Sequence, residues 1–169
     1  MSIVIRKGTL ADTEDYIRLL QEVQTGMSNQ EWFFLDPPEE IREMMETGMM
    51  QLWVAEEDGR LAGGFDYIVP GLADINYGYD LDFTREELLR VAQMDTAAVA
   101  SDYRGRGLQR ILMGKAEEEI RQKPGQILLT TVHPDNRYSL DNILKQDYSI
   151  AKRVEKYNSV RYVLRKDLP

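Results

Sequence analysis

The sequence predicts an α/β fold of the α+β type, in which a mixed, mostly antiparallel sheet of about seven strands is flanked by about four helices. Strand-like and helix-like segments alternate in the second half of the chain, which implies a parallel crossover. Hairpin signals at two places imply antiparallel pairs. The composition, 43% hydrophobic and 30% charged, is that of a globular chain.

The first third of the chain predicts one strand and two helices. Residues 2–6 have the pattern of a strand, and Thr9 and Asp12 then form a capping pattern before an apolar face at helical spacing. A second helix is expected to begin at Asp36-Pro37-Pro38, where proline suits the first turn, and to end near Gly48.

The remaining elements follow from runs of apolar residues and from turn signals. A turn at Asp58-Gly59 joins two strands, and a glycine- and tyrosine-rich loop follows. The expected elements are strands at 52–56 and 61–69, a loop at 71–82, a strand at 91–99, a helix from Leu108 to Pro124-Gly125, a strand at 127–132, a helix at 136–145, and strands at 150–157 and 160–165 around Asn158-Ser159.

Composition limits the compartment and the classes of site. Residues 1–169 contain no repeat or linker, so one domain is expected. The absence of cysteine excludes disulfides, thiolate metal sites and a cysteine nucleophile, and it fits a reducing, cytoplasmic location. A single histidine, His133, makes no metal cluster, so no metal is expected. No run of about 18 apolar residues predicts a membrane helix.

Charge is distributed unevenly along the chain, whose net charge is -8. Residues 1–90 carry 7 basic and 19 acidic side chains, whereas residues 91–169 carry 14 basic and 10 acidic ones. An acidic protein is a poor general nucleic-acid binder. The basic half suits a small polyanion and the acidic half a cation, although solvation of an ordinary surface explains the same pattern.

The segment from Val99 to Arg110 has the features of an anion site. A strand is followed by Ser-Asp-Tyr-Arg-Gly-Arg-Gly, and then by a long amphipathic helix. The start of a helix presents unpaired backbone N–H groups, and glycines allow a ligand to approach closely. Together they suit a phosphate group. A loop of this kind is also a common structural connection.

The same segment resembles motif A of the GNAT superfamily of acyl-CoA N-acyltransferases, Gln/Arg-x-x-Gly-x-Gly/Ala. Arg104 and Gly107 fit the motif, whereas Gln109 stands where Gly or Ala is usual. The resemblance implies the acyl-CoA N-acyltransferase fold, with acetyl-CoA as co-substrate. The implied cofactor contacts are Ala97, Ala98 and Val99 beside the pantetheine arm, and Arg104, Gly105, Arg106, Gly107, Leu108, Gln109 and Arg110 around the pyrophosphate.

A second block, Val132 to Ser139, resembles the family segment in which Asn-x-x-Ala/Ser opens a helix after the fifth strand. The resemblance implies cofactor contacts from Asn136 and Ser139, and Asn142 completes the expected set. Ile143 stands where the family often has a tyrosine that protonates the leaving thiolate, so the general acid is not identified.

The resemblance implies acetyl transfer from acetyl-CoA directly to a primary amine of a small molecule or a peptide. A non-catalytic acyl-CoA-binding or interaction module of the same fold is the alternative, because Ile143 departs from the catalytic pattern. Nucleic acid and membranes are not expected partners. Family members are often dimers, so a homodimer is one option.

Asp95 is the expected catalytic base, because a carboxylate inside an apolar strand requires a reason. Strand alternation predicts that Asp95, Ala97 and Val99 share one face. An exposed face or an ion pair with a neighbouring strand is the alternative explanation for Asp95.

The acceptor is expected to contact Tyr77, Tyr79 and Asp80, which could attract an ammonium group, and Trp32 between the first two helices. Simple packing is the alternative for each of these residues.

Overall fold

The computed structural model describes residues 2–169 and places the elements in the predicted order. Its strands are β1 (Val4–Lys7), β2 (Met50–Glu57), β3 (Arg60–Ile68), β4 (Val91–Val99), β5 (Ile127–Val132), β6 (Ser149–Lys156) and β7 (Ser159–Asp167). Its α-helices are α1 (Thr13–Gly26), α2 (Pro38–Thr47), α3 (Arg85–Leu88), α4 (Leu108–Ile120) and α5 (Arg137–Leu144). The described residues thus form five α-helices, where the sequence predicts about four. In the described chain, none of the helices has the length and apolar character needed to cross a membrane.

The strands form one sheet in the order β1-β2-β3-β4-β5-β7-β6. The pairs β1–β2, β2–β3, β5–β7 and β6–β7 are antiparallel, whereas β4 and β5 run parallel. The parallel ladder joins Val91, Ala92 and Gln93 to Ile127, Leu128 and Leu129. The predicted mixed, mostly antiparallel sheet flanked by helices is therefore confirmed.

The chain divides into two compact units. The first unit contains the described residues up to Gln30, Leu35–Ile68 and Asp95–Glu119. The second unit contains Glu31–Phe34, Val69–Met94 and Ile120–Pro169. Strand β4 contributes its first four residues to the second unit and its last five to the first.

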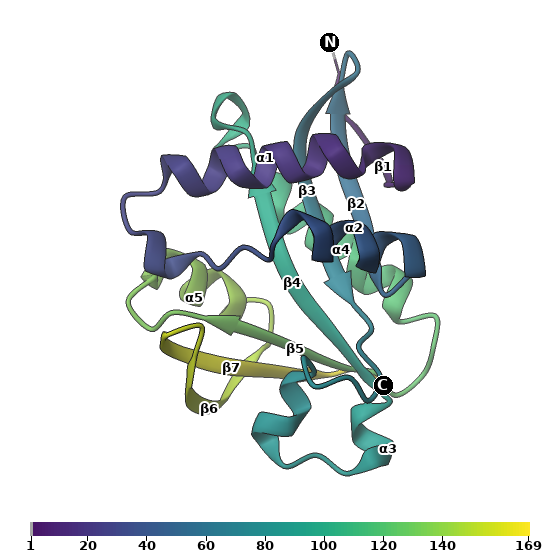
Figure 1. The fold of residues 1–169 in the computed structure, drawn as a ribbon, viewed down its shortest axis with the longest axis vertical. Coiled ribbons are helices and arrows are strands. Elements are labelled where there is room, and N and C mark those ends of the chain that lie inside the picture. The colour runs from purple at the N-terminus through teal and green to yellow at the C-terminus, as the bar shows by residue number, and fades with distance from the viewer. Residues whose placement is uncertain (1) are drawn as a thin grey trace. The chain divides into compact units, whose positions relative to one another are not determined.

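In the first unit, helices cover both faces of the strands. A Cβ built on Gly63 of β3 would meet Leu112 of α4, and one built on Gly64 would meet Tyr16 of α1. Since neighbouring residues of a strand point to opposite faces, α1 and α4 lie on opposite sides of β3. Figure 1 shows the same layering, with α1 and α2 in front of β2 and β3 and α4 behind them.

Positive backbone φ angles mark the two hairpin turns. Asp58 and Gly59, with φ of 51° and 77°, form the predicted turn between β2 and β3. The β6–β7 turn was predicted at Asn158-Ser159, but Tyr157 and Asn158 carry the positive φ angles of 59° and 56°. The prediction is wrong by one residue because Lys156 pairs with Ser159, which leaves those two residues as the loop.

In the second unit, the predicted loop at 71–82 contains a 3-10 helix, Tyr77–Leu81. Asn76 caps it by accepting the N–H of Gly78 at 2.7 Å. Tyr77 packs into a core with Val91, Ile127, Leu129 and Val163. This segment is therefore built around a buried tyrosine.

Gly64→Ala is expected to lower the free energy of unfolding by about 1–3 kcal/mol, the usual cost of overpacking a core. The new Cβ would lie 2.6 Å from Cε1 of Tyr16, whose side chain is fully buried. The matched control is Gly114→Ala in α4, where nothing lies within 4 Å of a built Cβ. Urea unfolding measures both variants, and a parental midpoint for Gly64→Ala would contradict this packing.

Candidate active site

The loop that joins β4 to α4 is an open turn with glycines in the left-handed region. Gly105 and Gly107 have φ angles of 80° and 73°, and nothing lies within 4 Å of a Cβ built on either residue. The N–H of Ile111 donates to the carbonyl of Gly107 at 3.1 Å, which begins the hydrogen bonding of α4. The N–H groups of Leu108, Gln109 and Arg110 therefore precede the first intrahelical bond, as expected at a helix start.

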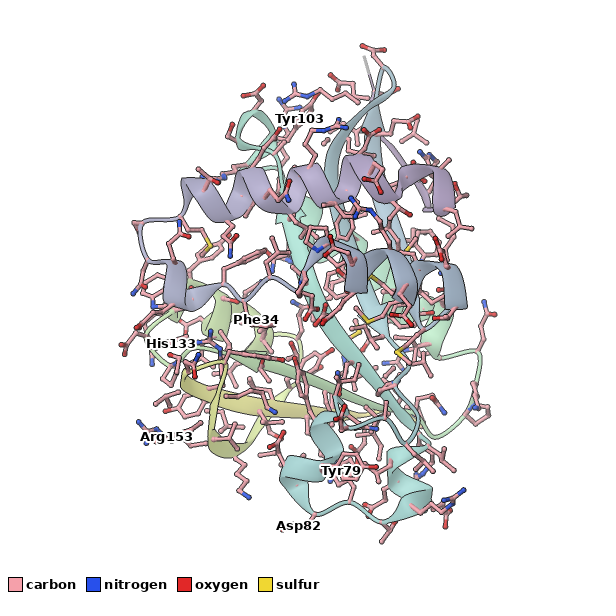
Figure 2. The ribbon with its side chains drawn as sticks, viewed as in Figure 1. Phe34, Tyr79, Asp82, Tyr103, His133 and Arg153 are labelled. Carbon is pink, nitrogen blue, oxygen red and sulfur yellow. The ribbon has the colours of Figure 1, made fainter. Side chains whose placement is uncertain are left out.

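Two buried side chains hold this loop, while its arginines reach solvent. Leu108 and Tyr103 are buried, and the hydroxyl of Tyr103 donates to Oε1 of Glu57 at 3.1 Å. The guanidinium carbon of Arg106 lies 4.9 Å from the centre of the Tyr103 ring. Arg104 and Arg110 are exposed. Figure 2 shows Tyr103 on this loop, beyond the end of β4.

These features suit a ligand that carries phosphate groups. The open turn leaves space beside two glycines, the helix start supplies backbone donors, and three exposed arginines supply positive charge. Within residues 2–169, no group of three or more His, Cys, Asp or Glu side chains is placed to hold a metal ion.

The prediction that Asp95, Ala97 and Val99 share one face of β4 is wrong. Val99 lies on the α4 side, because its Cγ2 is 3.7 Å from a Cβ built on Gly63. Asp95 instead lies beside Asp66, which shares the face of Gly64 and contacts Tyr16 of α1. We infer a bulge in β4 between Asp95 and Val99, since one extra residue reverses the alternation. Ala98 between them is buried.

Asp95 lies near other carboxyls, and the sequence did not predict this proximity. Asp66 of β3 is 1% exposed, and its Oδ2 accepts the hydroxyl proton of Tyr16 at 2.5 Å. The same hydroxyl lies 3.2 Å from the carbonyl oxygen of Thr96. The hydroxyl of Thr96 donates to Oδ2 of Asp95 at 3.2 Å. Tyr16 therefore fixes Asp66 beside the strand that carries Asp95.

Burial and mutual repulsion disfavour ionisation of these carboxyls. Burial first, and then the charge of Asp95, raises the pKa of Asp66 well above its usual value of 3.8. Burial also raises the pKa of Asp95. Oδ1 of Asp66 is buried without a hydrogen-bond partner. The side chains of Asp66 and Asp95 are in hydrogen-bonding contact with each other, and carboxylate pairs in such contact ionise in two separate steps.

Asp36, which precedes α2, is the third carboxyl of the group. Burial and the charges of Asp95 and Glu40 raise the pKa of Asp36 to about 6. In the described part of the chain, no lysine or arginine forms an ion pair with Asp36, Asp66 or Asp95. We call these three residues the acidic cluster, and all of them belong to the first unit.

Asp36, Asp66 and Tyr16 are the site residues that sequence reasoning missed. Asp66 had a usable signal, because it is a charged residue within an apolar strand, like Asp95. Asp36 was interpreted as part of a helix start, and α2 does begin at Pro38, directly after Asp36-Pro37. Tyr16 lies on the apolar face of the first helix, and helical spacing alone gives no sign of its hydroxyl hydrogen bond.

The other predicted cofactor contacts lie in the second unit around α5. Oδ1 of Asn136 accepts the N–H of Ser139 at 3.4 Å and caps the helix. Asn142 lies partly exposed one turn further along. Ile143 is buried in the core. A capping role explains why Asn136 and Ser139 occur at this spacing.

The predicted acceptor contacts also lie in the second unit. The hydroxyl of Tyr77 forms a 2.7 Å hydrogen bond with that of Tyr157, and Tyr79 donates to the carbonyl of Leu72 at 2.6 Å. Asp80 pairs with Lys156 at 3.0 Å. Figure 2 shows Tyr79 beside Asp82 on this loop. These contacts favour the packing alternative for the segment.

Trp32, the remaining predicted acceptor contact, is partly buried and lies near His133. The two ring centres are 6.4 Å apart, and Nε1 of Trp32 is buried without a hydrogen-bond partner. Nδ1 of His133 accepts the N–H of Asp135 at 3.0 Å, which directs its proton to the other ring nitrogen. His133 therefore stabilises the end of β5.

Asp66→Asn is expected to stabilise the folded chain at pH 7, by about 1–3 kcal/mol, because it removes a buried charge beside Asp95 and its amide can donate a hydrogen bond to that carboxylate. The folded-state pKa of Asp66 lies above its unfolded value, so the folded chain binds this proton more tightly. The stability of the parent therefore falls as pH rises above about 3.8, the unfolded pKa.

The advantage of Asp66→Asn should accordingly be larger at pH 7 than at pH 4. Urea unfolding at both pH values measures it. An equal or absent advantage at the two values would contradict a raised pKa at Asp66.

Comparison with known proteins places the chain in a family. The sequence profile of the Acetyltransferase (GNAT) family matches residues 15–146. A search of curated protein sequences found no significant match.

Three solved structures are similar to the whole chain. They are ribosomal-protein-alanine N-acetyltransferase from Brucella melitensis (20% identity, TM-score 0.72, 98% of this chain and 99% of that chain), Arabidopsis thaliana NAA60 in complex with acetyl-CoA (15%, 0.72, 98% and 98%), and Salmonella typhimurium yncA with its cofactor acetyl-CoA (14%, 0.72, 100% and 95%). At these identities the likeness shows the fold. Because the family profile covers most of the sequence, the chain belongs to the GNAT family of acetyltransferases.

Proposed function

We propose that this chain is an N-acetyltransferase that moves the acetyl group of acetyl-CoA directly to a primary amine of a small molecule or a peptide. The observation that carries the proposal is the open turn at Gly105 and Gly107, at the start of α4. Family membership and acetyl-CoA in two structures of the same fold support it.

The chain's own groups have separable roles toward the cofactor. The N–H groups at the start of α4 would bind the pyrophosphate, with Arg104, Arg106 and Arg110 supplying charge. The backbone of Ala97, Ala98 and Val99 would pair with the pantetheine arm, and Asn136, Ser139 and Asn142 would add contacts. Bound acetyl-CoA supplies a thioester whose carbonyl carbon an amine can attack.

Asp95 would accept a proton from the incoming amine. A lysine-like ammonium has a pKa of about 10.4, so presenting it neutral at pH 7 costs about 4.6 kcal/mol. A carboxylate whose pKa is raised is a better proton acceptor at neutral pH than an ordinary aspartate. An ammonium carries two protons in excess of the amide product, so one passes to Asp95 and the other leaves with the thiol.

The thiolate would leave without an identified acid from this chain. Ile143 occupies the position where the family often has a tyrosine, and it is buried. A thiol with a cysteine-like pKa of about 8.5 is a tolerable leaving group without a strong acid.

A non-catalytic acyl-CoA-binding or interaction module is the second candidate, and Ile143 is the observation that favours it. Thiol release from acetyl-CoA over a panel of primary amines separates the two functions. The chain has no cysteine, so the assay has no background from the protein. A single catalytic domain, a cytoplasmic location and a homodimer remain part of the proposal.

Gly107→Glu is expected to weaken acetyl-CoA binding more than about 100-fold, or about 2.7 kcal/mol, because it places bulk and negative charge at the pyrophosphate turn. Isothermal titration calorimetry measures the Kd. Gly107→Ala separates backbone strain at φ 73° from charge, and Gly114→Glu places the same side chain in open space on α4. Unchanged affinity in Gly107→Glu would remove this loop from the cofactor site.

Asp95→Asn is expected to lower kcat by about 100-fold to 10,000-fold, the usual contribution of a general base. The Kd for acetyl-CoA should stay at the parental value, because the change is remote from the pyrophosphate turn. Asp82→Asn, an exposed change at φ 55° that asparagine tolerates, is the control. Parental kinetics in Asp95→Asn would remove this carboxyl from the reaction.

A further inference from the structure

We propose that Arg60, the first residue of β3, forms a second phosphate site together with Arg106 and binds the 3′-phosphate of coenzyme A. This inference rests on the proposed use of acetyl-CoA. It adds a residue that distinguishes the complete cofactor from the form that lacks the 3′-phosphate.

Two guanidinium groups lie over the ring of Tyr103. The guanidinium carbon of Arg60 is 5.7 Å from the ring centre, and that of Arg106 is 4.9 Å from it. Tyr103 is buried, and its hydroxyl donates to Glu57, the last residue of β2, at 3.1 Å. Figure 2 shows Tyr103 at the end of the first unit where the turn between β2 and β3 lies. The ring therefore holds the two cations close to each other, beside the loop that precedes α4.

Most hydrogen-bond donors of these two arginines have no partner within residues 2–169. A guanidinium has five N–H donors. Arg60 uses one of them, in a 3.3 Å contact from Nη1 to Oδ2 of Asp102, and both side chains of that pair are more than half exposed. Across the same residues, the side chain of Arg106 forms no hydrogen bond or ion pair. Free donors on two neighbouring cations suit an anion that accepts several hydrogen bonds, as a phosphate group does.

The charged groups at this end of the first unit leave a positive excess. The carboxyls are those of Glu57, which accepts the ring hydroxyl, and Asp102, which contacts Arg60. The cations are Arg60, Arg104 and Arg106, all of them exposed. The chain as a whole has a net charge of -8. A local positive excess in an acidic chain attracts polyanions to this end rather than to the rest of the surface.

The covalent structure of coenzyme A requires its third phosphate to lie near its pyrophosphate. The pyrophosphate is attached to the 5′ carbon of a ribose, and the third phosphate to the 3′ carbon of the same ring. A chain that binds the pyrophosphate at the start of α4 therefore meets the 3′-phosphate close to that loop. Arg106 belongs to the loop, and the shared ring of Tyr103 brings Arg60 next to it.

An ordinary surface ion pair between Arg60 and Asp102 is the alternative. Exposed pairs of this kind contribute little to stability, and this one has a single contact at 3.3 Å. The pair explains the position of Arg60, but it does not explain the second guanidinium over the same ring, which has no carboxylate partner. A test of the inference has to measure binding of the 3′-phosphate itself.

The direct test compares coenzyme A with 3′-dephospho-coenzyme A, which differ only in that phosphate and carry no acetyl group. Each compound is titrated calorimetrically into the full chain at one fixed ionic strength, because salt screens exposed charges. We expect coenzyme A to bind at least tenfold more tightly, about 1.4 kcal/mol. Equal Kd values for the two compounds would overturn the inference.

Arg60→Gln tests whether this residue causes the preference. It should reduce the preference for coenzyme A to less than about threefold and leave the Kd of 3′-dephospho-coenzyme A at the parental value. Arg18→Gln is the matched control, because Arg18 is also an exposed arginine of the first unit with one carboxylate partner, Asp15 at 2.9 Å. A parental preference in Arg60→Gln, or an equal loss in Arg18→Gln, would overturn the inference.

The proposed function and this inference fail in different ways. If both compounds bind the parent with the same Kd, the coenzyme A site stands and the role of Arg60 is wrong. If neither compound binds, the coenzyme A site is wrong, and acetyl transfer from acetyl-CoA is wrong with it.

Discussion

The burial of the Asp66 carboxyl beside Asp95, fixed by the hydroxyl of Tyr16, is the constraint on which the first unit's chemistry depends. Gly64 admits the Tyr16 ring, because a Cβ there would lie 2.6 Å from it. The ring position sets the 2.5 Å bond to Asp66. Burial then raises the pKa of both carboxyls, and the charge of Asp95 raises that of Asp66 further. The missing side chain at Gly64 therefore bears directly on the acidity of the candidate site.

The cofactor side of the site rests on the backbone rather than on side chains. Gly105 and Gly107 adopt φ angles that other residues rarely adopt, and the start of α4 presents N–H donors beside them. The buried Tyr103 and Leu108 keep the turn in place. Here the protein offers positive charge to a polyanion.

Much of the fold could be predicted from sequence, since strand and turn patterns are local. The bounds of β4 and β5 and the turn at Asp58-Gly59 follow from composition and spacing alone. The opposite side-chain directions of Asp95 and Val99 could not be predicted, because strand alternation assumes an unbroken ladder. The cluster was missed for a related reason: Asp36, Asp66 and Asp95 are far apart in sequence and meet only through the tertiary fold. Conversely, Asp80 has the residue type of an acceptor contact but is paired with Lys156.

The raised pKa of Asp66 is most directly measured by a pH titration of the aspartate carboxyl ¹³C resonances in the free chain, with Asp66→Asn and Asp95→Asn used to assign the signals. We expect the carboxyl of Asp66 to ionise well above the usual aspartate pKa of 3.8. Ionisation of Asp66 near 3.8 would contradict the burial of this carboxyl beside Asp95.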